Sequence, residues 1–307
     1  MSLPAMRAIR QRFPKSSINI LAKPAVAELY TGESCADEII LYDSKSHSGM
    51  ARKLRTRRFD CAVLLPNSFS SAWVVWLAGI PNRIGYRRDG RGWLLTKAVD
   101  PPVRGEIPGH QRYYYLELLR RAGVMDALPE VPAISLEAGS KASPQRRIGV
   151  SPGAAYGTAK RWLPERFAEA AGRLAQARNA SIALFGAKAE RALCEQVAQM
   201  LGGHEVVNYA GETTLAQFIE LASSCEVFLT NDSGAMHIAS ALGIPTIAIF
   251  GATDEIATGP TGEKSRVVRQ PVECSPCLLR ECPIDHRCMS RVSASRVVEE
   301  ALQLLID

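Results

Sequence analysis

One stretch of this chain, from Thr230 to Pro260, determines the fold class of the half that contains it. A hydrophobic run at residues 227–229 ends in short polar residues, and an apolar helical pattern follows at residues 236–242. Gly243 ends that pattern, and a β-branched run follows at residues 244–250. A strand, a turn, a helix and a second strand in this order predict one βαβ unit with parallel strands.

The turn of this unit is typical of an anion-binding site. Asp232, Ser233 and Gly234 lie between a strand's carboxyl end and a helix N-terminus. There, free backbone N–H groups and the helix dipole favour an anion such as a pyrophosphate. An ordinary helix cap would account for Asp232 or Ser233 alone. It would not account for His237, which we expect one turn into the helix, facing the same crevice.

The same alternation of strands and helices runs along the whole chain. Hydrophobic runs separated by helical patterns predict parallel, doubly wound sheets in both halves. A segment rich in Pro, Ser, Gly and Ala at residues 129–144 reads as the linker. We therefore predict an α/β protein of two Rossmann-like domains, residues 1–143 and 144–307, which face each other across a ligand-binding cleft.

The first predicted element is out of order. Residues 4–13 form a helical pattern, yet no strand precedes them, although in a doubly wound domain a helix normally follows a strand. We therefore expect the first strand of this domain to be encoded upstream of Met1.

Further loops of the second half are expected at the same crevice. The segment from Ser151 to Gly157 follows a strand, and its small residues let a backbone approach a ligand, while Lys160 supplies a positive charge for phosphate. Two other loops carry glycine after a strand or before a helix, at Gly186 and around Thr213. Together with the turn after residue 230, these loops indicate a site for a nucleoside diphosphate.

Charge is distributed unevenly over the chain, whose net charge is +6. Residues 1–145 hold 21 Lys and Arg against 13 Asp and Glu, and the remainder hold 16 against 18. The basic first half indicates an anionic partner, and the sequence contains no nucleic-acid-binding module. A basic, glycine-punctuated loop at residues 79–96 is either a solvated loop or a grip for phosphate or carboxylate groups. Its arginines are Arg83, Arg87, Arg88 and Arg91.

Four cysteines cluster near the C-terminus as CSPCLLRECPIDHRC. Thiolates at C-x-x-C spacing can hold a structural zinc ion, although the two longer gaps are looser than those of a paired-knuckle site. The alternatives are reduced thiols or a redox disulfide. The candidate ligands are Cys274, Cys277, Cys282 and Cys288. The chain shows neither a signal peptide nor a membrane-spanning run, so we expect it in the cytoplasm.

Five segments resemble the ADP-heptose:lipopolysaccharide heptosyltransferases of glycosyltransferase family 9, and the resemblance spans nearly the whole chain. The segments are PAMRAIRQRFP, PNSFSSAWVVWLAGIPNRIGYRRDGRGWLLT, PGAAYGTAKRW, TNDSGAMHIASALG and CSPCLLRECPIDHRC. The resemblance implies the GT-B fold, with the acceptor bound by the first domain and the nucleotide sugar by the second. It implies an inverting transfer of L-glycero-D-manno-heptose from ADP-heptose to the inner-core heptose of lipopolysaccharide, at the cytoplasmic face of the inner membrane.

The resemblance also implies roles for individual residues. Donor-binding residues would be Gly153, Ala155, Tyr156, Lys160, Gly186, Thr213, Asp232, Ser233, Gly234 and His237; the catalytic residues among them would be Lys160 and His237. The four arginines of the basic loop would meet the anionic lipid A–Kdo–heptose acceptor. The aspartate that acts as general base in the family follows the expected upstream strand. No cofactor would be required, because Lys160 and the helix N-terminus stabilise the departing diphosphate.

Other functions fit the same pattern. One is another enzyme of this architecture that uses a different nucleotide sugar or a later core acceptor. A second is a nucleotide-sugar-binding protein that is catalytically impaired because it lacks the base. A nucleotide-sugar epimerase of related fold is a third, although it would not require the basic first half.

Overall fold

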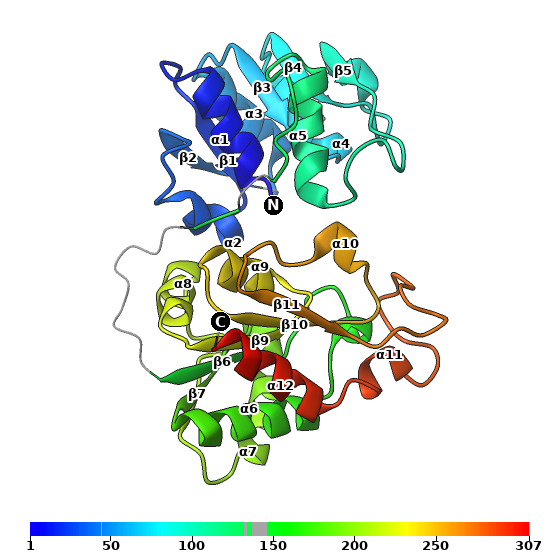
Figure 1. The fold of residues 1–307 in the computed structure, drawn as a ribbon. Coiled ribbons are helices and arrows are strands. Elements are labelled where there is room, and N and C mark those ends of the chain that lie inside the picture. The colour runs from blue at the N-terminus through cyan, green and yellow to red at the C-terminus, as the bar shows by residue number, and fades with distance from the viewer. Residues whose placement is uncertain (44, 132–133, 137–145, 307) are drawn as a thin grey trace. The chain divides into compact units, whose positions relative to one another are not determined.

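The computed structural model describes residues 1–43, 45–131, 134–136 and 146–306. The chain divides into two compact units, Met1–Pro132 (unit 1) and Ala133–Asp307 (unit 2) (Figure 1). Both contain parallel strands connected through helices, which confirms the predicted α/β class. The predicted boundary between residues 143 and 144 lies outside the described residues. Among the helices of the described ranges, none has the length and apolar character needed to cross a membrane.

Unit 1 contains five short strands and five α-helices within the described residues. In chain order its elements are α1 (Leu3–Arg12), β1 (Asn19–Ala22), α2 (Pro24–Ala27), β2 (Glu38–Leu41), α3 (His47–Arg55), β3 (Cys61–Leu64), α4 (Phe69–Leu77), β4 (Asn82–Tyr86), β5 (Lys97–Val99) and α5 (Gln111–Arg121). Two 3₁₀ turns, η1 (Glu28–Tyr30) and η2 (Gly92–Leu94), complete it.

The strands of unit 1 form two sheets, where the sequence predicted one. Strands β1 and β2 pair in parallel, and β3, β4 and β5 form a separate parallel sheet in that order. β1 and β3 are therefore both edge strands. Within the described residues no strand precedes α1, and the strand expected upstream of Met1 stays a prediction.

Shared helices cover both faces of these two sheets. On one face, Ala5 of α1 belongs to a cluster with α5 and Val63 of β3, while Met6 of the same helix packs on β1 and β2. On the opposite face, Ile40 of β2 and Leu64 of β3 pack in one cluster with α3 and α4. The alternation of side chains along a strand accounts for the two faces.

Unit 2 is larger, and its elements follow the predicted alternation. They are β6 (Arg147–Ser151), η3 (Thr158–Lys160), α6 (Pro164–Arg178), β7 (Ser181–Leu184), η4 (Lys188–Glu190), α7 (Arg191–Met200), β8 (Val206–Asn208), α8 (Leu215–Ser223), β9 (Val227–Asn231), α9 (Gly234–Ala241), β10 (Thr246–Phe250), α10 (Glu255–Thr258), β11 (Ser265–Arg269), α11 (Arg287–Ser290) and α12 (Ala294–Leu304).

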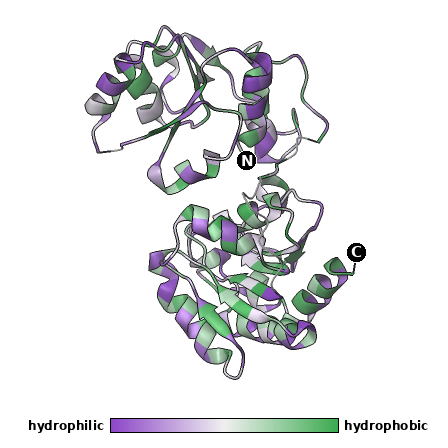
Figure 2. Cartoon of the chain, turned by 90° about the vertical axis from the view of Figure 1, so that its left-hand side faces the viewer, coloured by the Kyte–Doolittle hydropathy of each residue, from purple (hydrophilic) through white to green (hydrophobic). Residues whose placement is uncertain are grey.

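The sheet of unit 2 is doubly wound. Its six strands are parallel and lie in the order β11-β10-β9-β6-β7-β8. The chain moves outward from β6 to β8 and then returns to the other side of β6 at β9. Figure 2 shows green, hydrophobic strands in this unit, in keeping with the complete burial of β9 and β10. The topological switch point lies between the carboxyl ends of β6 and β9, which is where such sheets bind ligands.

Candidate functional site

Two predicted ligand-binding loops meet at this switch point. The loop after β6 begins at Pro152, and the turn after β9 begins at Asp232. Asn231 ties them together: its amide nitrogen donates to the carbonyls of Pro152 (2.8 Å) and Gly153 (3.3 Å). Its side-chain oxygen accepts from the Trp162 backbone N–H at 2.9 Å. Because Asn231 is fully buried, these bonds hold both loops in a defined geometry.

An ion pair lies at the centre of the site. The Lys160 Nζ donates to Asp232 Oδ2 at 2.6 Å, and both side chains are largely buried, at 13% and 5% exposed. The same carboxylate oxygen accepts hydrogen bonds from the hydroxyls of Thr253 (2.6 Å) and Thr258 (3.5 Å). An ammonium has three N–H donors, so the pair with Asp232 leaves two that can meet a ligand.

Tyr156 places an aromatic ring beside this lysine. The Lys160 Nζ lies 4.9 Å from the centre of the Tyr156 ring, and the Arg280 guanidinium lies 5.2 Å from it. The Tyr156 hydroxyl donates to the Leu278 carbonyl at 3.0 Å. Two cations over one half-exposed ring create a positive patch next to the ion pair.

The cysteine-bearing segment braces the loop that carries Lys160. His286 Nε2 lies 3.0 Å from the Ala159 carbonyl oxygen, and the Ala159 backbone N–H donates to the Arg280 carbonyl at 2.9 Å. Gly157 makes the closest approach, since a Cβ at this position would lie 2.2 Å from the Arg280 carbonyl oxygen. Any side chain there would displace one of the two segments, which explains the glycine.

The zinc expectation for this segment stays a prediction. All four cysteines carry free thiols, and no set of three or more His, Cys, Asp or Glu in the described ranges is arranged to hold a metal ion. The thiols are nevertheless near one another. Burial, and then the charges of Cys274, Cys277 and Cys282, raise the pKa of Cys288. The segment that carries these cysteines also braces the Lys160 loop, through the contacts of His286 and Arg280 with Ala159.

Three other predicted donor-binding residues lie along the same edge of the sheet. A Cβ on Gly153 would lie 2.1 Å from Glu190 Oε1, and one on Gly186 would lie 3.4 Å from Glu190 Oε2. The turn that carries Thr213 is joined to this region because the Gly211 backbone N–H donates to the Gly186 carbonyl at 2.9 Å. The structure thus brings these loops to one edge, with a carboxylate between the two glycines.

The N-terminus of α9 follows Asp232 directly. Ser233 caps the helix through a hydrogen bond from the Met236 N–H at 3.4 Å, and its hydroxyl lies 3.1 Å from that of Thr230. Gly234 is exposed at the first position of the helix, and His237 is partly exposed one turn later. The predicted residues therefore occupy the first turn of this helix, where backbone N–H groups have no intrahelical acceptor.

The four arginines of the basic loop, which belongs to unit 1, divide into two pairs. Arg91 is fully buried and donates to the carbonyls of Tyr86, Pro66 and Ser68 and to the Ser71 hydroxyl. Arg83 likewise donates to backbone carbonyls, including that of Leu94 at 2.6 Å. Arg87 and Arg88 are exposed, and Arg87 lies 3.6 Å from Asp100. Only the exposed pair presents its charge to solvent; the other two stabilise the fold.

Several residues of the site were not among the predicted ones. Asn231, Thr253, Thr258, Glu190 and Arg280 all contact a predicted residue or loop. The sequence pointed to three of them: the two threonines lie in the stretch that ends at Pro260, and Arg280 lies between two cysteines of the cluster. The contacts themselves depend on tertiary packing across the switch point.

This arrangement can bind a diphosphate and stabilise negative charge on it. It combines a lysine with spare donors, a helix N-terminus and small residues that allow close backbone approach. The buried Asp232 carboxylate would repel a diphosphate placed against it, so its geometry suits a residue that orients Lys160.

The chain matches one protein family, described as glycosyltransferase family 9 (heptosyltransferase), over residues 48–287. It is 30% identical to lipopolysaccharide heptosyltransferase 2 of Escherichia coli K12, in an alignment that covers 100% of this chain and 95% of that protein. Identity to the enzyme of the same name from Salmonella typhimurium is also 30%, over 88% and 84% of the two chains. The solved structure of E. coli ADP-heptose lps heptosyltransferase II superimposes with a TM-score of 0.83 at 29% identity, covering 99% and 94% of the two chains.

Proposed function

The chain belongs to glycosyltransferase family 9, and we propose that it transfers L-glycero-D-manno-heptose from ADP-heptose to the inner-core heptose of lipopolysaccharide, with inversion at the anomeric carbon. The relatives that align with most of this chain are heptosyltransferases named for lipopolysaccharide or lipooligosaccharide. Unit 2 would bind the donor, and unit 1 the acceptor.

The observation that carries the proposal is the Lys160–Asp232 pair at the switch point of unit 2. It joins a buried, oriented ammonium to a helix N-terminus at the edge of the sheet where nucleotides bind. In this reading Lys160 and the first turn of α9 bind the diphosphate, and Tyr156 supports the lysine. Gly153, Ala155, Gly186 and Thr213 would line the rest of the donor site.

The same residues would promote departure of ADP. In an inverting transfer the acceptor hydroxyl gives up its proton to a base and attacks the anomeric carbon opposite the leaving ADP, through a transition state that resembles an oxocarbenium ion. Negative charge grows on the β-phosphate as the glycosidic bond breaks, and Lys160 and the α9 N-terminus would stabilise it. The proposal therefore includes no metal ion. His237 would contact the donor sugar or its phosphate from the end of the first turn of α9.

Asp232 would act as a positioning residue. Its Oδ2 atom holds Lys160 while Thr253 and Thr258 hold Asp232, so the ammonium cannot rotate freely away from the diphosphate. A carboxylate that touched the diphosphate directly would oppose the growing charge.

The acceptor would be an anionic glycolipid. The basic first half of the sequence fits the phosphate and carboxylate groups of a lipid A–Kdo–heptose molecule, with Arg87 and Arg88 as its exposed contacts. We further place the reaction at the cytoplasmic face of the inner membrane, with peripheral membrane contact.

Nucleotide titration tests the donor assignment. Calorimetry with the full chain should show that ADP binds at least about tenfold more tightly than UDP, a difference of about 1.4 kcal/mol. Tighter binding of UDP would contradict the proposed donor and favour an enzyme that uses a different nucleotide sugar.

A further inference from the structure

Four aromatic rings gather on one surface of unit 1. Phe69, Trp73 and Trp76 occupy successive turns of α4, and Trp93 reaches them from η2. Ring centres of Trp73 and Trp76 are 5.1 Å apart in a stacked arrangement, and Trp93 lies 6.0 Å from Trp76 and 6.4 Å from Phe69. We call these four residues the aromatic cluster.

The cluster faces solvent. Phe69 is 41% exposed, Trp76 is 40% exposed and Trp93 is 64% exposed, whereas Ala72 and Val75 of the same helix are buried in the core. Helix α4 thus buries one side and presents a second, aromatic side outward. Exposed contiguous aromatic surface of this kind marks an interaction site.

The fold holds the cluster in place before any partner arrives. Arg91, which directly precedes η2, is buried. Its guanidinium donates to the Ser68 carbonyl at 3.2 Å and to the Ser71 hydroxyl at 3.1 Å, at the start of α4. These bonds hold the segment that carries Trp93 against the start of α4. The cluster therefore loses little conformational entropy when it is covered.

A strongly basic helix packs beside α4. Helix α3 and the residues after it carry exposed positive side chains, and the Arg55 guanidinium donates to the Leu77 carbonyl, one residue beyond Trp76. The basic residues are Arg52, Lys53, Arg55, Arg57 and Arg58. Acidic groups near this face include Glu38, which pairs with Arg57, Asp60, and Asp89 beside Arg91.

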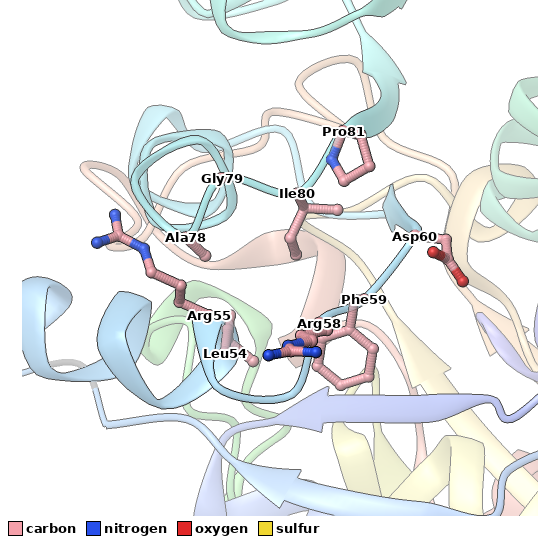
Figure 3. A pocket seen from close by; sticks show the side chains of 9 residues that line it. All are labelled: Leu54, Arg55, Arg58, Phe59, Asp60, Ala78, Gly79, Ile80 and Pro81. Atoms are coloured by element: carbon pink, nitrogen blue, oxygen red, sulfur yellow. The ribbon is translucent and has the colours of Figure 1, made fainter.

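A pocket of about 290 Å³ lies between the carboxyl ends of these two helices (Figure 3). Arg55 and Arg58 line it together with Gly79 and Ile80, and Asp60 lies across from Arg55. Its size and its two guanidinium groups suit a phosphate-bearing headgroup. The aromatic cluster and the basic residues of α3 therefore lie side by side. Together they indicate a partner that is both apolar and anionic.

We propose that the α3–α4 face of unit 1 docks onto an anionic lipid bilayer. Tryptophan rings prefer the membrane–water interface because they are apolar with one polar edge, and clustered arginines and lysines bind anionic lipid phosphates. The excess of positive over negative side chains on α3 selects a bilayer over a neutral apolar partner. This deepens the proposed function, because a lipid-borne acceptor is presented at such a surface, but it rests on the geometry of unit 1 alone.

Tryptophan fluorescence of the full chain provides the test. Three of the four tryptophans belong to the cluster, and the fourth, Trp162, is 1% exposed. Vesicles of phosphatidylglycerol and phosphatidylethanolamine should shift the emission to shorter wavelength and protect it from acrylamide, and brominated acyl chains should quench it. Phosphatidylcholine vesicles should bind about tenfold more weakly, because they lack the anionic attraction.

Variants and a matched control make the test specific. Combined Phe69→Ala and Trp93→Ala should lower partitioning onto anionic vesicles about tenfold or more, because the rings would no longer be buried in lipid. Phe13→Ala removes an equally exposed ring, 42% against 41%, that lies beside Arg12 and outside the cluster, and it should leave binding unchanged. Arg52→Gln with Lys53→Gln should also weaken binding and reduce its salt dependence.

Three results would overturn the inference. They are unchanged fluorescence with anionic vesicles, equal binding to both vesicle types, and an equal loss on Phe13→Ala. Transfer to a delipidated, water-soluble acceptor should be unaffected by Phe69→Ala with Trp93→Ala. If that transfer fell while vesicle binding stayed intact, the cluster would hold acceptor sugar instead. Vesicle binding is measured without donor or acceptor, so its failure is separable from failure of the proposed function.

Discussion

Replacing Lys160 by methionine tests the donor site most sharply, because methionine keeps an unbranched chain and removes the ammonium with its charge and its three N–H donors. The ammonium is 13% exposed and 2.6 Å from Asp232, so its interaction with a nearby phosphate is only partly screened by water. At about 4 Å and an effective dielectric of about 20, two unit charges interact by about 4 kcal/mol.

Loss of one preorganised donor to a developing charge typically lowers turnover by about 10²–10³. We therefore expect Lys160→Met to reduce kcat by about that factor. ADP affinity should fall less, by about tenfold, because the charge on the β-phosphate grows only as the bond breaks.

The assay is turnover of the nucleotide sugar at saturating donor, with ADP affinity measured by calorimetry on the same preparations. Arg161→Met is the matched control: it removes a neighbouring positive charge whose guanidinium donates to the Ala154 carbonyl at 3.3 Å. Thermal unfolding of both variants establishes that they are folded. Equal and mild losses of kcat in the two variants would refute the role given to Lys160.

Three further predictions follow from other contacts. Gly157→Ala should raise the donor KM severalfold and lower stability by about 1–3 kcal/mol, because its Cβ would collide with the Arg280 carbonyl; steady-state kinetics with unchanged KM would contradict this. The Glu117 carboxyl is fully buried, and hydrogen bonds from Arg120 and then Arg121 hold its pKa below the ordinary 4.5. The ionised Glu117 therefore stabilises the folded state fully above pH 4.5, and this stabilisation is lost as the pH falls through the pKa of Glu117 in the folded protein. Glu117→Gln should lower the free energy of unfolding by about 1–2 kcal/mol at pH 7, and it should make that free energy depend less on pH below 4.5 than in the wild type. The same pH dependence in both proteins would contradict this role of Glu117. Cys288 should alkylate more slowly than the other cysteines of its segment near pH 8, because burial raises its pKa, and equal rates would contradict this. Elemental analysis of the same protein tests the zinc hypothesis, which well under one zinc per chain would contradict.

Much of unit 2 was predictable because its signals are local. The hydrophobic run that forms β9 and the β-branched run that forms β10 are fully buried strands, and the polar turn between β9 and α9 lies where the pattern placed it. Short connections between strands and helices allow few arrangements, so the alternation along the chain is enough to predict parallel strands linked by helices. The resemblance to glycosyltransferase family 9, based on five segments, is confirmed by the family match and by relatives that align over nearly the whole chain.

The features that the sequence did not predict depend on contacts outside the local pattern. Nothing in the loop sequence distinguishes Arg91, which is buried against carbonyls, from Arg88, which is exposed, because the difference arises from where α4 packs. The cysteine spacing predicts zinc, which stays a prediction, but it does not predict that the backbone of the same segment contacts Tyr156 and Ala159. The strands of unit 1 form one sheet only if a further strand pairs with both β1 and β3. Which strands pair with one another cannot be predicted from the hydrophobic runs alone.

The central claim is transfer of a heptosyl group, and mass spectrometry of the acceptor tests it most directly. The full chain would be incubated with ADP-heptose and purified lipid A carrying Kdo and one heptose, and the glycolipid would be weighed before and after. We predict that the acceptor gains one heptosyl residue for each ADP released, and that Lys160→Met slows both by the same factor. Release of ADP without any gain in acceptor mass, or transfer from a UDP-sugar in place of ADP-heptose, would contradict the account.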